Sequence, residues 1–255
     1  MRNQDAELLR RVSVSVHFMQ AALIVACLGI GLFAQTPSWK PVRFRDGLLP
    51  LTPMQAVAGG EVFVQATVTD AGRVGNVTAL RTSPPFTEYV LDAVRGWRFQ
   101  PAEQTVLRTP GDPRSIVTEP VEAKAFVGCV FRPPTLNTPT LGEPPKDVRI
   151  ASDDVAFPLS IVTPLYPPQA NADATVLIEV TVGIDGRVVR AGSLRSTAGF
   201  EESALNAARQ WTFRPARIHG RLEETFAYLV FAFRRPVTTS PLTSPSPSPT
   251  SPTLK

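Results

Sequence analysis

Cysteine and histidine are scarce in this chain of 255 residues, which holds two of each. Cys27 lies in an apolar run, and the one remaining thiol, Cys129, cannot build an internal disulfide framework. The net charge is only +4, and the 26 basic residues are interleaved with 22 acidic ones rather than gathered on one face. Nucleic-acid binding is therefore not expected.

Motifs that carry catalytic chemistry are also missing. His17 lies in an apolar segment and His219 stands beside Gly220, so neither belongs to a recognisable catalytic group. The sequence contains no zinc-binding, serine-nucleophile or phosphate-binding glycine motif. We expect no enzyme, no metal site and no cofactor.

A mostly apolar stretch, residues 12–34, follows Arg10 and Arg11 near the N-terminus. As a helix its 23 residues would extend about 34 Å, enough to cross the core of a bilayer. The two arginines place residues 1–11 in the cytoplasm and the bulk of the chain outside. This pattern predicts a single-pass membrane anchor.

Two other interpretations of this stretch stay open. The strictly apolar part, residues 21–34, suits a cleaved signal peptide, although Leu32 stands where such a cleavage site needs a small residue. The residues ending at Cys27 resemble a lipoprotein cleavage box, although the residues that follow stay apolar. All three interpretations export the chain.

The polar residues of the anchor form one stripe. At 100° per residue, Ser13, His17 and Gln20 fall within roughly a 60° arc of the helix. An ionisable residue inside a spanning helix is costly and usually faces a partner or a proton path. The alternative is an ordinary polar lead-in to a signal sequence, where nothing constrains the order.

The rest of the chain contains an internal repeat. Residues 53–102 align without a gap on residues 167–216, and 21 of the 50 pairs are identical. Both copies end a helix-like stretch with the phrase Trp-x-Phe-x-Pro-Ala, at residues 97–102 and 211–216. An offset of 114 residues therefore organises the protein.

Each copy reads as strand, turn, strand, helix, strand. In the second copy alternating valines predict a strand at residues 176–182, and the Asp and Gly that follow suit a hairpin turn. The next strand, residues 187–195, has apolar residues spaced for a bulge. Helical spacing covers residues 200–211, and the Trp-x-Phe phrase then predicts a core-filling helix-to-strand junction.

The last strands are predicted at residues 121–132 and 222–235, and 12 additional residues before the first of them are expected to form a loop. We therefore expect an α+β fold of two ββαβ modules, each an antiparallel three-stranded sheet with one helix, that fold separately. The predicted modules are residues 41–132 and 151–235, joined by a Pro-rich linker at 133–150. A Pro/Ser/Thr tail at 236–255 is expected to be disordered.

The modules resemble the C-terminal domain of the TonB family. The second copy carries the resemblance through the segments "YPPQA" (166–170), "DGRV" (185–188) and "AARQWTFRPA" (207–216), followed by an aromatic strand. The resemblance implies an energy-transducing adaptor in the inner membrane, with its bulk in the periplasm. It implies an ExbB–ExbD proton-channel complex and outer-membrane receptors as partners, with Ser13 and His17 facing the channel complex.

The topology predicts a partner-binding edge in the second module. If the third strand pairs with the first, the order is second, first, third, and the third strand is left as an open edge. The residues expected to bind an extended receptor segment there are Thr225, Phe226, Ala227, Tyr228, Leu229, Val230 and Phe231. Alternatively, the first module, the tail or a second copy covers this edge. The alternative function is a cell-envelope scaffold, or a peptidoglycan-associated binding module, without energy coupling.

Overall fold

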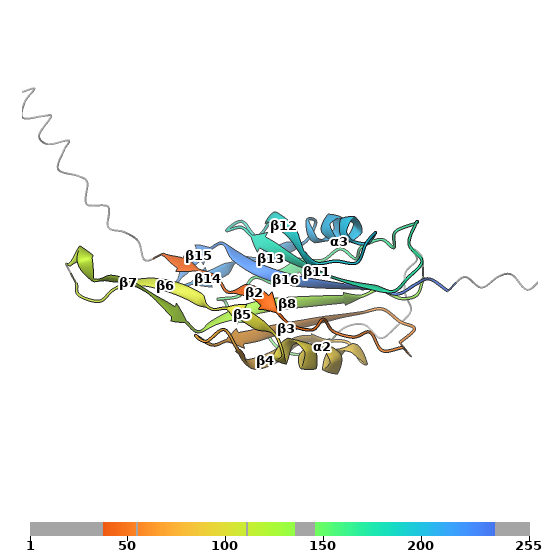
Figure 1. The fold of residues 1–255 in the computed structure, drawn as a ribbon, viewed down its shortest axis with the longest axis horizontal. Helices are drawn as coiled ribbons and strands as arrows, with labels where there is room; N and C mark the ends of the chain where they lie inside the picture. Colours follow the sequence, from red (N-terminus) through yellow and green to blue (C-terminus); the bar gives the residue numbers. More distant parts are fainter. Residues whose placement is uncertain (1–37, 55, 111, 136–145, 238–255) are drawn as a thin grey trace, which may run out of the picture. The chain divides into compact units, whose positions relative to one another are not determined.

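The structure is a computed structural model that describes residues 38–54, 56–110, 112–135 and 146–237 (Figure 1). The predicted cytoplasmic segment, the predicted anchor at 12–34 and the tail beyond residue 237 lie outside the described residues. None of the helices in the described part of the chain is long and apolar enough to cross a membrane.

Strands dominate both repeats, and the predicted α+β class is confirmed. The first repeat comprises β1 (Trp39–Lys40), β2 (Arg43–Asp46), β3 (Gly60–Val68), β4 (Val74–Thr82), α2 (Phe86–Arg95), β5 (Arg98–Gln100), β6 (Ala102–Leu107), η1 (Pro113–Ser115), β7 (Ile116–Val121) and β8 (Ala123–Phe131). The second comprises β9 (Lys146–Asp147), β10 (Phe157–Ser160), β11 (Ala174–Val182), β12 (Val188–Arg195), α3 (Glu201–Ala208), β13 (Thr212–Arg214), β14 (Ala216–Ile218), β15 (Arg221–Glu223) and β16 (Thr225–Phe233).

A glycine fixes the turn of the long hairpin in each repeat. Gly186 between β11 and β12 has a φ of +78°, which L side chains rarely adopt. Its carbonyl accepts a hydrogen bond from the N–H of Phe213 at 2.8 Å. A Cβ at Gly186 would lie 2.0 Å from the carbonyl oxygen of Phe213. Gly72 repeats this contact with Phe99 in the first copy, so the turn and the helix-to-strand junction are built against each other.

The helix-to-strand junction fills the core as predicted, although α3 ends at Ala208 and not at Trp211. The helix ends early because the chain tightens here, with Gln210 and Trp211 donating to carbonyls three residues back. The Trp211 side chain is 1% exposed, and its Nε1 donates to the carbonyl of Val162 at 3.0 Å. Trp97 donates in the same way to the carbonyl of Leu48.

The two repeats share one seven-stranded sheet with the order β12-β11-β16-β8-β3-β4-β9. Within each repeat the predicted order of second, first and third strand is confirmed. β16 pairs with β8 in parallel, from the pair Ala227 and Phe126 to the pair Ala232 and Phe131. The expectation of an open third strand is therefore wrong, because the first module covers it. The predicted bulge in β12 is present, since Val189 is skipped in the pairing with β11.

The two helices cover opposite faces of this sheet. Val176, Ile178 and Val180 of β11 pack in the core cluster that contains α3 residues, whereas Leu177 packs in the cluster that contains α2 residues. Neighbouring residues of a strand point to opposite faces. Each helix thus lies over the strands of its own repeat, α3 beside β11 and β12, α2 beside β3 and β4 (Figure 1).

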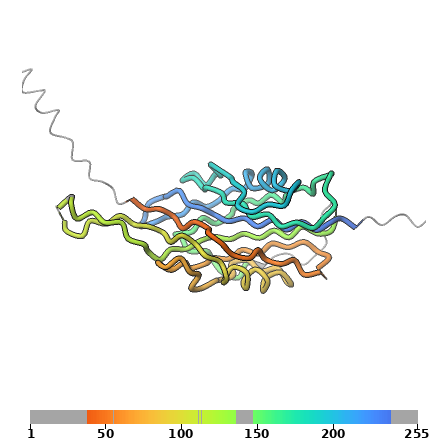
Figure 2. Tube along the Cα trace, in the orientation of Figure 1, coloured from red at the N-terminus to blue at the C-terminus, as the bar shows by residue number. Residues whose placement is uncertain are grey.

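Each repeat sends an N-terminal arm across the strands of the other. The first arm, residues 39–49, lies over the third strand of the second repeat (Figure 2), where the carbonyl of Val42 accepts a hydrogen bond from the hydroxyl of Tyr228. The second arm, residues 151–163, reaches the first repeat, where the ring of Phe157 lies 6.2 Å from that of Phe63 and 6.1 Å from that of Phe126. Phe63 also lies 6.2 Å from Trp211. Both cores are built from both repeats, which does not fit the expectation that the modules fold separately.

The additional residues of the first repeat form a hairpin rather than the expected loop. β6 and β7 pair with each other, and the hydroxyls of Thr105 and Thr118 lie 3.1 Å apart across them. The tip, Val106–Ile116, belongs to a separate compact unit. Within it Asp112 accepts a hydrogen bond from the N–H of Arg114 at 2.9 Å. The end of the predicted linker is also ordered into a strand, because β9 pairs with β4.

Replacing Gly186 by alanine should destabilise the protein severely, because the new Cβ meets the Phe213 carbonyl in addition to the strain of a positive φ. Gly199 is the matched control: its φ is +84°, but a Cβ there meets nothing within 4 Å. We expect Gly199→Ala to cost about 1–2 kcal/mol and Gly186→Ala clearly more, as measured by urea unfolding. Equal costs would show that the turn does not dock on the junction.

Because the cores are shared, we expect one unfolding transition for the full chain. Trp97→Ala and Trp211→Ala should each lower its free energy of unfolding by about 3–5 kcal/mol, the range for a buried aromatic. Calorimetry of the full chain checks this, with Val189→Ala as a control because Val189 is 64% exposed. Two transitions, each shifted by only one of the tryptophan substitutions, would mean that the repeats unfold independently.

Candidate partner-binding surface

The residues predicted to form a partner-binding edge lie in the middle of the sheet. Thr225–Phe231 belong to β16, which pairs with β11 on one side and β8 on the other. All of these side chains are buried except that of Phe226, which is half-buried. No backbone row of this strand is open to a further chain, so peptide addition at this strand is not proposed. The predicted coupling residues, Ser13 and His17, lie outside the described residues.

A signal for the central position of this strand was present in the sequence. A strand with one solvated face alternates apolar and polar residues, whereas a strand buried on both faces reads as a continuous apolar run. The stretches 225–233 and 125–131 are both nearly free of polar residues. Each of them therefore indicates a strand covered on both faces, which is typical of the interior of a sheet.

Tyr228 of β16 ties the first arm to the second repeat. Its hydroxyl accepts a hydrogen bond from the N–H of Phe44 and donates one to the carbonyl of Val42, each at 2.9 Å. Burial raises the pKa of this hydroxyl well above its ordinary value, and the negative charge of Glu179 acts in the same direction. Tyr228 therefore stays neutral and serves as a structural link between the repeats.

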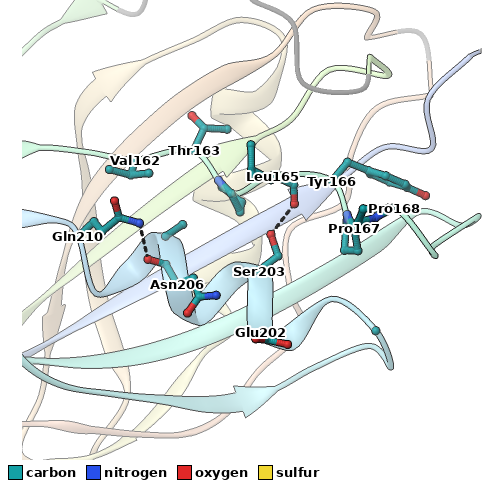
Figure 3. A pocket seen from close by; sticks show the side chains of 13 residues that line it. Val162, Thr163, Leu165, Tyr166, Pro167, Pro168, Glu202, Ser203, Asn206 and Gln210 are labelled. Carbon is teal, nitrogen blue, oxygen red and sulfur yellow. Dashed lines mark hydrogen bonds between the residues drawn. The ribbon is translucent and has the colours of Figure 1, made fainter.

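An apolar groove of about 320 Å³ lies between α3 and the chain segment that enters the second repeat (Figure 3). Leu165, Tyr166 and Pro167 face the helix residues Ser203 and Asn206 across it. The Ser203 hydroxyl donates to the carbonyl of Leu165, and Gln210 donates to the carbonyl of Asn206 at 2.8 Å. These polar groups are satisfied within the chain, so the groove presents mainly apolar surface.

The described residues hold neither a metal-ligating cluster nor a reactive cysteine. Among them, no group of three or more His, Cys, Asp or Glu side chains is placed to hold a metal ion. Cys129 is buried in β8, and this burial raises the pKa of its thiol far above the ordinary value. A thiol held in the neutral form and away from solvent is not a nucleophile.

The two outer edges of the sheet differ. On the β4 side, β9 adds a short strand, and Arg81 binds Asp147 of that strand with its Nε at 2.7 Å. On the other side β12 is the outermost strand, and within the described part of the chain nothing pairs with its outer side. As far as the chain is described, strand β12 is therefore unpaired on its outer side along its whole length, whereas β9 occupies the Arg81–Thr82 end of β4.

Comparison with known families decides the relationship. The family described as Gram-negative bacterial TonB protein C-terminal matches residues 52–111 and 162–234, which together make up more than half of the chain. The chain belongs to this TonB C-terminal family. Both repeats are matched, so the resemblance inferred from the sequence is confirmed for the first repeat as well as the second. No curated protein matches the chain.

The TonB C-terminal family is a transport-related adaptor domain rather than an enzyme family. In this chain two such domains lie side by side in one sheet, joined through the third strand of each. The family features of the second copy, including the buried Tyr166 and Trp211, lie in its core.

Removing the Tyr228 hydroxyl should weaken the link between the repeats. Tyr228→Phe leaves the N–H of Phe44 without its acceptor, which we expect to cost about 1–3 kcal/mol in urea unfolding at neutral pH. Tyr89→Phe is the control, since Tyr89 is 42% exposed on α2. A loss within about 0.5 kcal/mol, the usual range for a surface change, would contradict this role.

We also expect the stability of Tyr228→Phe to depend differently on alkaline pH from that of the native protein. The pKa of Tyr228 is raised in the folded state, so its contribution to stability is full below the unfolded value of 10.0 and is lost as pH rises above it. Unfolding of the native protein should therefore depend more steeply on pH above about 10 than unfolding of Tyr228→Phe. Identical slopes would mean that Tyr228 ionises as freely in the folded protein as in the unfolded chain.

Proposed function

We propose that this protein is a TonB-like energy-transducing adaptor in the inner membrane, with its two domains in the periplasm. It couples an ExbB–ExbD-like proton-channel complex to outer-membrane receptors for transport. The observation that carries the proposal is the family match over both repeats. The N-terminal stretch 12–34 behind Arg10 and Arg11 supports it, because its length and flanking charge suit a single-pass anchor.

In this proposal the polar stripe of the anchor receives the energy. His17 lies one helical turn after Ser13, and both would face the proton-channel complex. A titratable imidazole in a spanning helix is suited to respond to proton movement, because its ordinary pKa lies close to physiological pH. The folded domains would then transmit the resulting movement to a receptor segment.

One structural observation favours the second candidate, a cell-envelope scaffold without energy coupling. The third strands of the two domains, β8 and β16, are paired with each other and closed to a further strand. A scaffold would use the double domain as a rigid body and would need neither Ser13 nor His17. The two candidates therefore differ in what substitution of the anchor does.

We expect His17→Ala to abolish coupled function while membrane insertion stays intact. The measurement is cross-linking of the full chain in intact cells, with and without a proton uncoupler, followed by mass spectrometry of the captured partners. Energised wild-type protein should yield channel-complex and receptor adducts that the uncoupler and His17→Ala both remove. Ser15→Ala is the matched control, because Ser15 is a polar residue of the same segment that lies off the stripe.

Two results would overturn the coupling proposal. Adducts that are indifferent to the uncoupler and to His17→Ala would favour the scaffold. Mass spectrometry that finds a mature N-terminus near Gln35, or a lipid on Cys27, would remove the anchor and the coupling together.

A further inference from the structure

The chain already binds an extended segment at one edge of its own sheet. β9 pairs antiparallel with the end of β4, and the N–H of Val148 donates to the carbonyl of Leu80 at 3.0 Å. Asp147 of this segment accepts hydrogen bonds from Nε and Nη2 of Arg81, at 2.7 and 3.5 Å. Backbone pairing and one arginine–carboxylate contact together hold the segment on the edge.

The repeat reproduces this edge in β12, where the described residues do not fill it. Leu194 and Arg195 are the equivalents of Leu80 and Arg81 at the offset of 114 residues. Both leucines are the extra residue of a bulge, since each is skipped in the pairing with the preceding strand. Leu80 is 1% exposed and belongs to a core cluster that includes Ala151 and Val155 of the second arm, whereas Leu194 is 39% exposed. The same local geometry is therefore covered in one repeat and open in the other.

The side chains along β12 favour an acidic occupant. Arg195 uses its two terminal nitrogens for Asp46 and the carbonyl of Gly47, and its Nε, the atom that Arg81 gives to Asp147, has no partner among the described residues. Arg190 is paired with Thr181 and Arg195 with Leu177, two residues on the same face of β11. The two arginines therefore share a face of the edge strand.

Gly192 lies between these arginines, and a Cβ there would meet nothing within 4 Å. A glycine inside a strand that no packing requires is typical of a place where another backbone approaches closely. Val189, at 64% exposure, adds apolar surface to the same strand. Backbone groups, apolar surface and positive charge thus coincide on one edge.

We propose that β12 (Val188–Arg195) binds an extended acidic segment of a partner protein by strand addition, as Lys146–Val148 binds β4. The partner's backbone would donate to the carbonyl of Leu194, and its carboxylates would face Arg190 and Arg195. A second copy of this chain is a poorer occupant, because pairing of two β12 strands would bring their arginines together. If the partner is an outer-membrane receptor, that identity rests on the proposed adaptor function. The proposal that β12 binds an acidic segment does not depend on that function.

The test uses the full chain in detergent and two synthetic peptides, one of alternating valine and aspartate and one of alternating valine and lysine. Amide hydrogen exchange read by mass spectrometry should show protection of Val188–Arg195 with the aspartate peptide only, and no change in β16. Arg190→Glu and Arg195→Gln should each weaken binding about tenfold or more, the effect expected on losing a charge-assisted hydrogen bond.

Two controls separate recognition from general charge and from folding. Arg209→Glu makes the same charge reversal at the end of α3, which covers the face of the sheet opposite to Arg190 and Arg195, and should leave binding unchanged. Arg195→Gln also loses the contacts of Arg195 to Asp46 and to the carbonyl of Gly47 in the first arm. Arg190→Glu is therefore the deciding variant, since no side-chain hydrogen bond of Arg190 is found within the described residues.

Several results would overturn the proposal: no protection of β12, equal protection by the lysine peptide, or protection on another strand. Protection of the outward-facing amides of β12, those that do not bond to β11, before any peptide is added would also overturn it. If that protection rises with protein concentration, a second copy is the occupant, and if it does not, another part of the same chain is. The proposed adaptor function fails separately, through an insensitive His17→Ala variant with β12 binding intact.

Discussion

The parallel pairing of β8 with β16 is the contact on which the rest of the structure depends. It runs from Phe126 beside Ala227 to Phe131 beside Ala232, and the N–H of Arg132 extends it to the carbonyl of Ala232 at 2.8 Å. β8 and β16 are equivalent strands of the two repeats. Because they pair in parallel, one repeat is turned over relative to the other, and the two helices lie on opposite faces of the sheet. Each half then lacks cover on one face, and the arm of the other half supplies it.

This arrangement makes the two cores interdependent. Phe63 and Phe126 of the first repeat belong to the cluster around Trp211, and Tyr228 of the second belongs to the cluster around Trp97. Ion pairs also join each arm to the other repeat. Lys124 of the first repeat binds Asp154 of the second arm at 3.0 Å, and Arg43 of the first arm binds Glu179 of the second repeat at 3.2 Å. Separation of β8 from β16 would expose apolar side chains on both faces, which opposes opening of this seam.

The contact between Asp154 of the second arm and Lys124 of the first repeat depends on the ionisation of the Asp154 carboxyl. Burial alone would raise the pKa of its carboxyl, but hydrogen bonds from Ser152 and Lys124, together with the charge of Lys124, hold the pKa below its ordinary value. A depressed folded pKa means that the contact stabilises the protein above the unfolded value and weakens as pH falls. The second arm is thus held on the first repeat most firmly with the carboxylate ionised.

Local features of the fold followed from the sequence, whereas the relation between the repeats did not. The strand order within a repeat, the bulge at Val189 and the buried Trp211 all depend on residues close together in the sequence or on one hairpin. The pairing of β8 with β16 joins segments about a hundred residues apart, and no turn fixes it. Its one sequence signal, apolar residues on both faces of the third strand, specifies that a neighbour exists but does not specify which one. The hairpin β6–β7 was missed because its strands are polar and short.

The candidate site was mislocated for the same reason. A three-stranded module considered alone leaves its third strand open, and a second module turns that edge into the interior of the sheet. Once both third strands are used, the only long edges that remain among the described strands are the second strands, β4 and β12. Connectivity then separates these two, since the chain leaving β8 returns along β4 as β9, whereas the chain leaving β16 runs beside Pro134 through Val237. Two copies of one sequence pattern thus acquire different surfaces, because the duplicated strands are equivalent and the segments that connect them are not.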